Sequence, residues 1–305
     1  MNLYLHHYPA SLFSEKIRVM LGYLGLSWRS VVIPSIMPRP LLMPLSGGYR
    51  KTPCLQIGAN VYCDTAVIAR GLVRHAGDET LFAPGFVAHR VAEWADTQLF
   101  RVTVALNFSP EAIGPMMSQL SPEEVTAFAA DRAKLAEGGS LVALSPTAAR
   151  ASLAQSLHEL EASLGAPFLF GVAPSIADFS LYHCLWFLKG NAHNAPLLAP
   201  FAAIGAWMGR MAAFGHGDSR EVSGEDALAD AKASDPVLPK LETSLPQGLS
   251  LGARARVTPI DYGIVPVEGT LVACSWDEVV LEREDPAVGR VLTHFPSAGF
   301  EVTPL

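Results

Sequence analysis

Two stretches of the sequence decide the fold: Arg50-Lys51-Thr52-Pro53-Cys54-Leu55 and Asp64-Thr65-Ala66-Val67-Ile68-Ala69. The first leads into a short strand pattern, Cys54–Ile57, and a second strand pattern, Val61–Cys63, follows a turn at Gly58-Ala59-Asn60. In the second stretch, Asp64 or Thr65 can cap a helix that runs to about His75. A hairpin followed directly by a helix is therefore predicted.

The residues before these stretches predict a strand, a helix and a second strand. The strand patterns are Leu3–His7 and Trp28–Ile33, and apolar residues at spacings of three and four indicate a helix over Ser14–Leu24. The order βαβ and then ββα is that of a thioredoxin-like domain, which we place at residues 1–80. In such a domain we expect a cis proline at Pro53, beside the reactive position.

That reactive position lies where the first strand meets the first helix, and here it reads Ser11-Leu12-Phe13-Ser14. The spacing is that of a CxxC motif, but serine forms no disulfide, so dithiol chemistry on the protein itself is excluded. A serine hydroxyl can still donate a hydrogen bond to the thiolate of a ligand, which would lower the thiol pKa from its free value near ~8.5. The alternative is that Ser11 or Ser14 is only a helix cap.

Residues 84–235 are expected to form an all-helical domain. Val87, Val91, Trp94, Gln98, Val102 and Ala105 share one helix face, and Leu153, Leu157, Leu160 and Leu164 form a second stripe. We interpret both stripes as core. A capping box is predicted at Ser121–Glu124, and Ser175-Ile176-Ala177-Asp178 is expected to cap a further helix without any catalytic role.

The C-terminal part of the chain has a different period. Residues 236–249 hold Pro236, Pro239 and Pro246 and are interpreted as a linker. Beyond them apolar residues alternate with polar ones, as in Ala253, Ala255 and Val257, and turn residues such as Asp261-Tyr262-Gly263 separate the runs. Residues 250–305 are therefore predicted to form a small antiparallel barrel. A chain that ends near Asp235 is expected to stay soluble, unless the barrel covers an apolar face of the helical domain.

The side chains around Pro53 suit a zwitterionic γ-glutamyl group. The residue before a cis proline can pair its backbone with an extended peptide. The start of the helix at Thr65 offers free N–H groups and a hydroxyl to a carboxylate, and Asp64 can accept from an α-ammonium. Lys51 can meet a carboxylate of the ligand, although a surface lysine is the simpler interpretation.

Taken together, these stretches are similar to the glutathione-binding region of glutathione transferases. The resemblance covers roughly residues 1–215 and includes the cap at Ser175–Asp178. It implies glutathione as co-substrate, a homodimer, and Lys51, Thr52, Pro53, Asp64 and Thr65 as binding residues. The family usually carries Val or Ile at the position of Thr52, Glu or Gln at Asp64, and Ser at Thr65.

Ser11 matches the catalytic serine of the serine-type classes of that family, and Tyr8 is its rival because other classes use a tyrosine near the end of the first strand. The predicted function is activation of the glutathione thiolate for attack on a small electrophile. The alternative is a non-catalytic binding or scaffold protein that uses its C-terminal strands to contact a partner.

Composition narrows the remaining possibilities. The net charge of −7 and pI near 5.7 argue against a nucleic-acid partner. Four widely spaced cysteines, and the lack of a signal-peptide pattern at Met1, favour a reduced cytoplasmic setting. The apolar window from Leu197 to Phe214 is expected to be a buried helix, so no membrane partner is predicted. No metal is expected either, because neighbouring His6 and His7 point to opposite faces of a strand.

Overall fold

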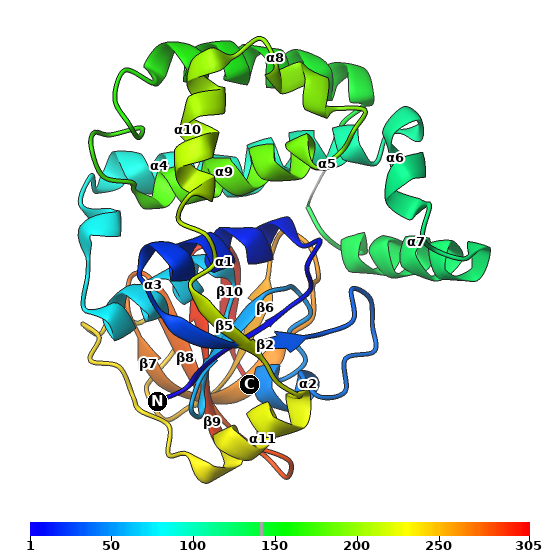
Figure 1. Cartoon of the computed structure of the whole chain (residues 1–305). Helices are drawn as coiled ribbons and strands as arrows, with labels where there is room; N and C mark the ends of the chain where they lie inside the picture. Colours follow the sequence, from blue (N-terminus) through cyan, green and yellow to red (C-terminus); the bar gives the residue numbers. More distant parts are fainter. Residues whose placement is uncertain (141–142) are drawn as a thin grey trace.

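A computed structural model describes residues 1–140 and 143–305 of the chain. Figure 1 shows two layers: a sheet with its own helices below, and a group of helices from the middle of the chain above. The first and last parts of the chain both lie in the lower layer, so segments far apart in sequence share one sheet.

The thioredoxin-like domain is confirmed. Its elements are β1 (Leu3–His7), α1 (Leu12–Tyr23), β2 (Ser27–Val32), α2 (Met43–Ser46), β3 (Cys54–Ile57), β4 (Asn60–Cys63) and α3 (Thr65–Ala76). β1 pairs with β2 in parallel and with β3 antiparallel, and β3 pairs antiparallel with β4. The peptide bond between Thr52 and Pro53 is cis, as expected.

The middle of the chain is helical, as predicted. It comprises η1 (Thr80–Phe82), α4 (Phe86–Trp94), a π-helical turn η2 (Ala95–Leu99), α5 (Phe100–Asn107), α6 (Pro110–Met117), α7 (Pro122–Ala136), α8 (Pro146–Ser163), α9 (Ile176–Lys189), η3 (Ala195–Leu198) and α10 (Ala202–Ala212). The capping box at Ser121 is present, since Glu124 N donates to Ser121 Oγ (3.2 Å) and Ser121 N donates to Glu124 Oε2 (2.8 Å).

One of the two apolar stripes is core only in part: Val102 is buried, and Val91 and Ala105 pack against the core, as expected. In the α8 stripe, Leu153 and Leu157 are buried, as expected. On α4, however, Val87 is 53% exposed and Trp94 is 39% exposed. Small residues, Ala88, Ala92 and Ala95, face the core there instead, because α4 packs closely against α9. The larger apolar side chains are left on the outer face.

A short strand, β5 (Asp218–Glu221), interrupts the expected helical region and is followed by α11 (Gly224–Ala233). β5 pairs in parallel with β2, with Trp28 opposite Ser219. All four residues of β5 are exposed and polar, so the strand lacks the alternation on which a prediction depends. It forms one edge of the sheet.

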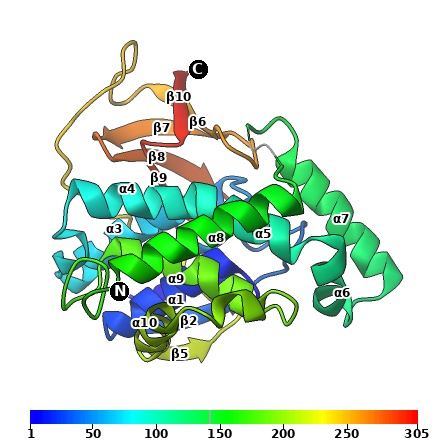
Figure 2. The ribbon, with the colours of Figure 1, turned by 90° about the horizontal axis from the view of Figure 1, so that it is seen from above.

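The C-terminal strands are antiparallel, as predicted, and they continue the first sheet. They are β6 (Arg254–Pro259), β7 (Val267–Cys274), β8 (Glu278–Asp285), β9 (Gly289–Pro296) and β10 (Phe300–Pro304). The strand order is β10-β6-β7-β8-β9-β4-β3-β1-β2-β5, because β9 pairs in parallel with β4. In the view of Figure 2, α3 and α4 lie between these strands and α1.

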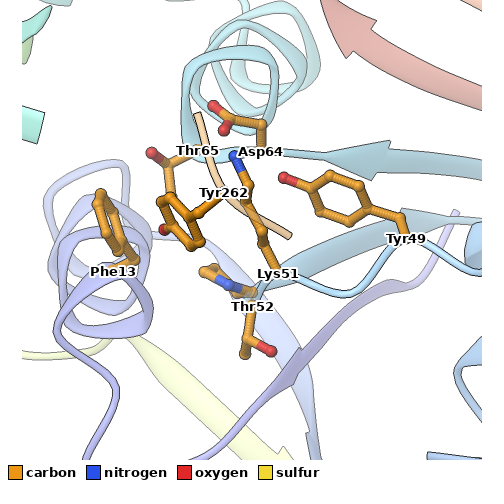
Figure 3. Close-up of a pocket in the computed structure, with 8 residues that line it drawn as sticks. Phe13, Tyr49, Lys51, Thr52, Asp64, Thr65 and Tyr262 are labelled. Carbon is orange, nitrogen blue, oxygen red and sulfur yellow. The ribbon is translucent and has the colours of Figure 1, made fainter. Parts of the chain in front are cut away.

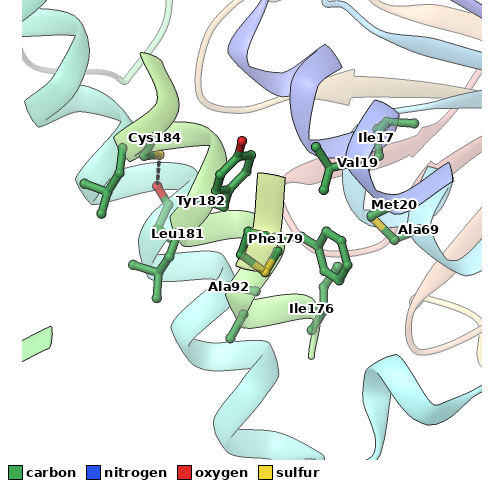
Figure 4. Close-up of a cluster of buried hydrophobic side chains, with 14 of the residues drawn as sticks. Ile17, Val19, Met20, Ala69, Ala92, Ile176, Phe179, Leu181, Tyr182 and Cys184 are labelled. Carbon is green, nitrogen blue, oxygen red and sulfur yellow. Dashed lines mark hydrogen bonds between the residues drawn. The ribbon is translucent and has the colours of Figure 1, made fainter. Parts of the chain in front are cut away.

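Two large core clusters, and one small one, lie among the described residues. One joins α1 and α3 to the helical layer, and Figure 4 shows part of it, with Phe179 and Tyr182 of α9 facing Val19 and Met20 of α1. The other large cluster combines residues of the first domain, among them Tyr49 and Val61, with C-terminal residues such as Phe295. The C-terminal strands are thus part of the core beneath the first domain.

A buried polar cluster fastens these strands to α3. Glu278 and His294 are fully buried, and His294 Nδ1 lies 2.7 Å from Glu278 Oε1, while Arg74 Nη1 lies 2.6 Å from Glu278 Oε2. Asn60 Oδ1 accepts from Val237 N (2.8 Å), so its Nδ2 is the atom that donates to His294 Nε2 (2.9 Å). His294 is therefore neutral, with its proton on Nδ1, and burial lowers its pKa accordingly.

Candidate functional site

Ser11 is the N-cap of α1. Its Oγ accepts a hydrogen bond from Ser14 N (3.2 Å), and the side chain is nearly buried. A capping hydroxyl uses its oxygen and keeps its hydrogen free to donate. The two interpretations of Ser11, as a cap and as a donor to a thiolate, are therefore compatible in one side chain.

Thr52 and Pro53 are held in place by a buried arginine. Arg39 Nη1 donates to Thr52 Oγ1 (2.8 Å) and to Arg50 O (2.8 Å). One guanidinium thus contacts the residues on both sides of Lys51, through the backbone of Arg50 and the side chain of Thr52. This contact accounts for threonine at the position before the proline, since valine or isoleucine has no oxygen to accept from Arg39.

Asp64 and Thr65 start α3 as expected. Asp64 has φ of 100°, a conformation that residues with a side chain rarely adopt, and its Oδ1 accepts from Ala66 N (2.9 Å). Burial raises the pKa of Asp64, whereas the charge of Lys51 opposes that rise. Lys16 Nζ donates to Thr65 Oγ1 (3.4 Å). Because Lys16 can only donate, the hydroxyl hydrogen of Thr65 is left for a ligand.

One pocket brings all five predicted binding residues together. It is lined by Lys51, Thr52, Pro53, Asp64 and Thr65, together with Phe13, Tyr49 and Tyr262. In Figure 3 the ammonium of Lys51 and the hydroxyl of Tyr49 point toward Asp64, and the ring of Tyr262 lies beside Lys51. Among the described residues, Ser11 is not part of this lining, but its neighbour Phe13 is.

The sequence did not indicate the contribution of the C-terminal region to this pocket. Lys51 Nζ lies 2.5 Å from Asp261 Oδ1 and 4.3 Å from the centre of the Tyr262 ring. Tyr262 also stacks on Phe100, whose ring contacts that of Phe13. The only sequence signal at this loop was its turn composition, which carries no information about a lysine 210 residues away.

A buried network connects the pocket to the helical layer. Lys16 Nζ lies 2.6 Å from Asp96 Oδ2 in the π-helical turn η2, and His183 Nε2 lies 2.9 Å from Asp96 Oδ1. Burial alone would raise the pKa of Asp96, but the contacts with Lys16 and His183 outweigh burial and lower it. The carboxyl is therefore ionised. Since Lys16 also contacts Thr65, the start of α3 is tied to α9.

The remaining motifs have structural roles. Ser175 N and Ser175 Oγ both donate to Asp178 Oδ2 (2.8 and 2.9 Å), which confirms the predicted cap, and Asp178 Oδ1 accepts from Trp207 Nε1 (2.9 Å). Across residues 1–140 and 143–305, no group of three or more histidine, cysteine or acidic residues could hold a metal ion. Within the same ranges, no helix has the length and apolar character needed to cross a membrane.

Comparison with known proteins places the chain in a family. Residues 5–80 match the family model of the glutathione S-transferase N-terminal domain, and residues 126–210 match that of the C-terminal domain. A GST-like protein from Pseudomonas syringae is 39% identical over the whole of both chains, with a TM-score of 0.85. The chain therefore belongs to the glutathione S-transferase family, and its likeness to the Pseudomonas protein includes the C-terminal strands.

More distant structures share only the fold. FzlA from C. crescentus is 18% identical, with a TM-score of 0.51 over 69% of this chain and 88% of its own. A glutathione S-transferase from Rhodospirillum rubrum F11 is 15% identical, with a TM-score of 0.52 over 69% of this chain and 87% of its own. No curated protein sequence matches the chain.

Proposed function

We propose that this protein is a glutathione transferase that binds glutathione beside Pro53 and activates its thiol for attack on a small electrophile. The observation that carries the proposal is the pocket in which Lys51, Thr52, Pro53, Asp64 and Thr65 meet. Asp64 would accept from the α-ammonium of the γ-glutamyl group, and Thr65 would donate to its carboxylate. Lys51 would pair with the second carboxylate of the tripeptide.

Ser11 is the residue that we assign to thiol activation. Its hydroxyl lies at the N-terminal end of α1, where the helix dipole favours an anion. A hydroxyl that donates to the sulfur stabilises the thiolate, lowers the thiol pKa and increases the fraction of nucleophile at neutral pH. The electrophile would lie against the rings of Phe13 and Phe100.

The role of Asp64 can be tested without removing the helix cap. Asparagine caps a helix as well as aspartate does, so Asp64→Asn removes the charge and keeps the contact to Ala66 N. We expect it to weaken glutathione binding by a charged hydrogen bond, roughly 1.5–3 kcal/mol, in a calorimetric titration. Asp78→Asn is the matched control, since Asp78 makes the same contact to Thr80 N at an exposed turn. Equal affinities for wild type and Asp64→Asn would remove Asp64 from the site.

A non-catalytic binding or scaffold protein is the second candidate function. It is favoured by the position of Ser11 outside the pocket lining and by the C-terminal loop that enters the site. A panel of electrophiles, assayed with and without glutathione, separates the two. Turnover that depends on glutathione supports the enzyme, whereas retention on glutathione resin without turnover supports the scaffold.

We further propose a homodimer formed through the outer face of α4. Phe86, Val87 and Trp94 are 76%, 53% and 39% exposed there, and large exposed apolar side chains mark protein contacts. Light scattering should give twice the chain mass of 32.6 kDa for wild type and the chain mass for Val87→Glu. Val172→Glu, at a site 86% exposed elsewhere, should remain dimeric. A monomeric wild type would refute this proposal.

The cytoplasm is the compartment that we propose for this activity. All four cysteines, Cys54, Cys63, Cys184 and Cys274, are buried free thiols. A compartment that keeps thiols reduced suits both these side chains and a glutathione co-substrate.

A further inference from the structure

We propose that the loop of residues 260–263, which lies between β6 and β7, blocks the glutathione site as a plug. Glutathione then binds only when this loop withdraws. The proposal rests on the proposed function, because it takes glutathione as the ligand. Two side chains of the loop carry it: Asp261 pairs with Lys51, and Tyr262 forms part of the pocket wall. The loop thus places a carboxylate and a ring where the ligand must go.

The first argument concerns the charge of Lys51. Its side chain is only 9% exposed, and its ammonium is shared between the Asp261 carboxylate (2.5 Å) and the faces of Tyr262 (4.3 Å) and Phe300 (5.6 Å). A carboxylate of glutathione can reach Lys51 only by displacing Asp261. One carboxylate is then exchanged for another, so the ligand gains only the difference between two similar interactions.

The second argument concerns space. The pocket offers about 20 Å³, which is enough for one water molecule and too little for a γ-glutamyl group. Tyr262, in the loop between β6 and β7, is the lining residue contributed by the C-terminal region, and its ring lies beside Lys51 and Thr65 in Figure 3. Withdrawal of Tyr262 would enlarge the pocket on the side that faces Phe13.

The third argument is an unused polar group in the same pocket. The hydroxyl of Tyr49 is fully buried and has no hydrogen-bond partner among the described residues. Such a group costs free energy unless something binds it, and in a native structure it needs an explanation. A polar ligand beside Asp64 would supply the partner, which indicates that the pocket is built to be occupied.

The loop is held by contacts that can open without disrupting a core. Gly263 N donates to Leu135 O (2.7 Å), Ser140 N donates to Asp261 O (2.7 Å), and Ser140 Oγ donates to Ile260 O (3.0 Å). These contacts join the loop to the end of α7. Every residue of α7 from 122 to 136 is exposed or only partly buried.

α7 is in turn docked on the first domain mainly by polar contacts. Arg50 Nη2 lies 2.6 Å from Asp131 Oδ1, and Arg132 Nη2 donates to Ser35 O (2.6 Å). Segments with few buried apolar contacts open at low free-energy cost. Loop 260–263 can therefore separate from the end of α7 while the two large core clusters stay intact.

The first test measures glutathione affinity by calorimetry in three variants. Asp261→Asn and Tyr262→Ala should each bind glutathione about tenfold more tightly than wild type, a difference of about 1.4 kcal/mol. Glu268→Gln is the control, because Glu268 forms an exposed ion pair with Arg256 on neighbouring strands and should bind as wild type does. Thermal unfolding of each variant verifies that it is folded.

The outcomes are distinguishable. Equal, measurable affinity in wild type, Asp261→Asn and Tyr262→Ala would overturn the plug and leave the proposed function standing. Folded variants that bind no glutathione at all would overturn both, since a site that is open and still does not bind glutathione is not a plugged glutathione site.

The second test follows the loop directly in the wild-type protein. Hydrogen exchange of the Gly263 and Ser140 amides should become faster when glutathione is added, because both amides lose their acceptors as the loop withdraws. The exchange rates of the Val257 amide in β6 and of the Leu281 amide in β8 should not change. Slower exchange at Gly263 and Ser140 with glutathione bound would mean that the loop closes on the ligand, which contradicts a plug.

Discussion

Replacing Ser11 by alanine is expected to lower glutathione-dependent turnover about ten- to a thousandfold, the scale of one lost transition-state donor. Affinity for glutathione should stay within several-fold of wild type, because the contacts to the γ-glutamyl group at Asp64 and Thr65 remain. The pKa of the bound thiol should rise toward its free value, and the ultraviolet absorbance of the thiolate reports that change.

Ser11 also caps α1, so a loss of stability has to be separated from a loss of chemistry. Replacing a serine N-cap by alanine costs about 1 kcal/mol, whereas glycine costs only a few tenths. Ser11→Gly should therefore be more stable than Ser11→Ala and equally poor in turnover. If Ser11→Gly restored turnover along with stability, the effect of Ser11 would be that of a cap alone.

Two further variants test the alternatives to Ser11. Ser14 Oγ is buried without a hydrogen-bond partner among the described residues, so Ser14→Ala should leave turnover and stability nearly unchanged. Tyr8 packs against the second core cluster, and Tyr8→Phe should keep the thiolate signal. Loss of that signal in Tyr8→Phe, with its survival in Ser11→Ala, would assign the thiolate to Tyr8.

The parts of the fold that sequence predicted correctly are those with local causes. β1 (Leu3–His7) and β3 (Cys54–Ile57) have the expected bounds, because each is a short, buried run ended by turn residues. The cap at Ser175–Asp178 involves side chains three residues apart, and Asp64 caps α3 through a contact two residues away. Contacts between residues two or three positions apart can be predicted from the sequence.

The errors have equally physical causes. Val87 and Trp94 have helical spacing but face outward, because the alanines of α4 allow α9 to approach closely and so decide which face is buried. The polar strand β5 forms only because β2 offers a free edge to it. Spacing defines an apolar stripe, but packing partners decide whether it is buried.

The pocket was predicted only on the side of the first domain. Lys51, Thr52, Pro53, Asp64 and Thr65 are close in sequence and carry a recognisable pattern. Asp261 and Tyr262 reach Lys51 only because β6 and β7 belong to the same sheet as β4, and that arrangement depends on the parallel pairing of β9 with β4. No short-range pattern encodes a pairing between residues more than 230 positions apart.

A chain truncated after Asp235 is now expected to aggregate, the reverse of what a separable barrel predicts. The C-terminal strands cover an apolar face of the first domain: Tyr49 lies against Phe295 and Phe300, and Tyr62 stacks on His294 at 4.2 Å. Each large apolar side chain uncovered costs about 1.5–3 kcal/mol, so a few of them match the roughly 5–15 kcal/mol that keep a domain folded. Soluble yield and light scattering of the truncated chain measure the outcome. A soluble monomer that binds glutathione would restore the separable barrel.

A point substitution tests the same attachment within the full chain. Glu278→Ala removes a fully buried carboxylate that Arg74 and His294 both contact, and the buried Nδ1–H of His294 that is left without an acceptor costs about 1–3 kcal/mol. Glu282→Ala is the matched control on the same strand, since its contact with Arg290 is exposed and worth about 0–1 kcal/mol. Thermal melting should therefore show a large loss of stability for Glu278→Ala and almost none for Glu282→Ala. Similar melting of the two variants would mean that the C-terminal strands contribute little to holding the first domain together.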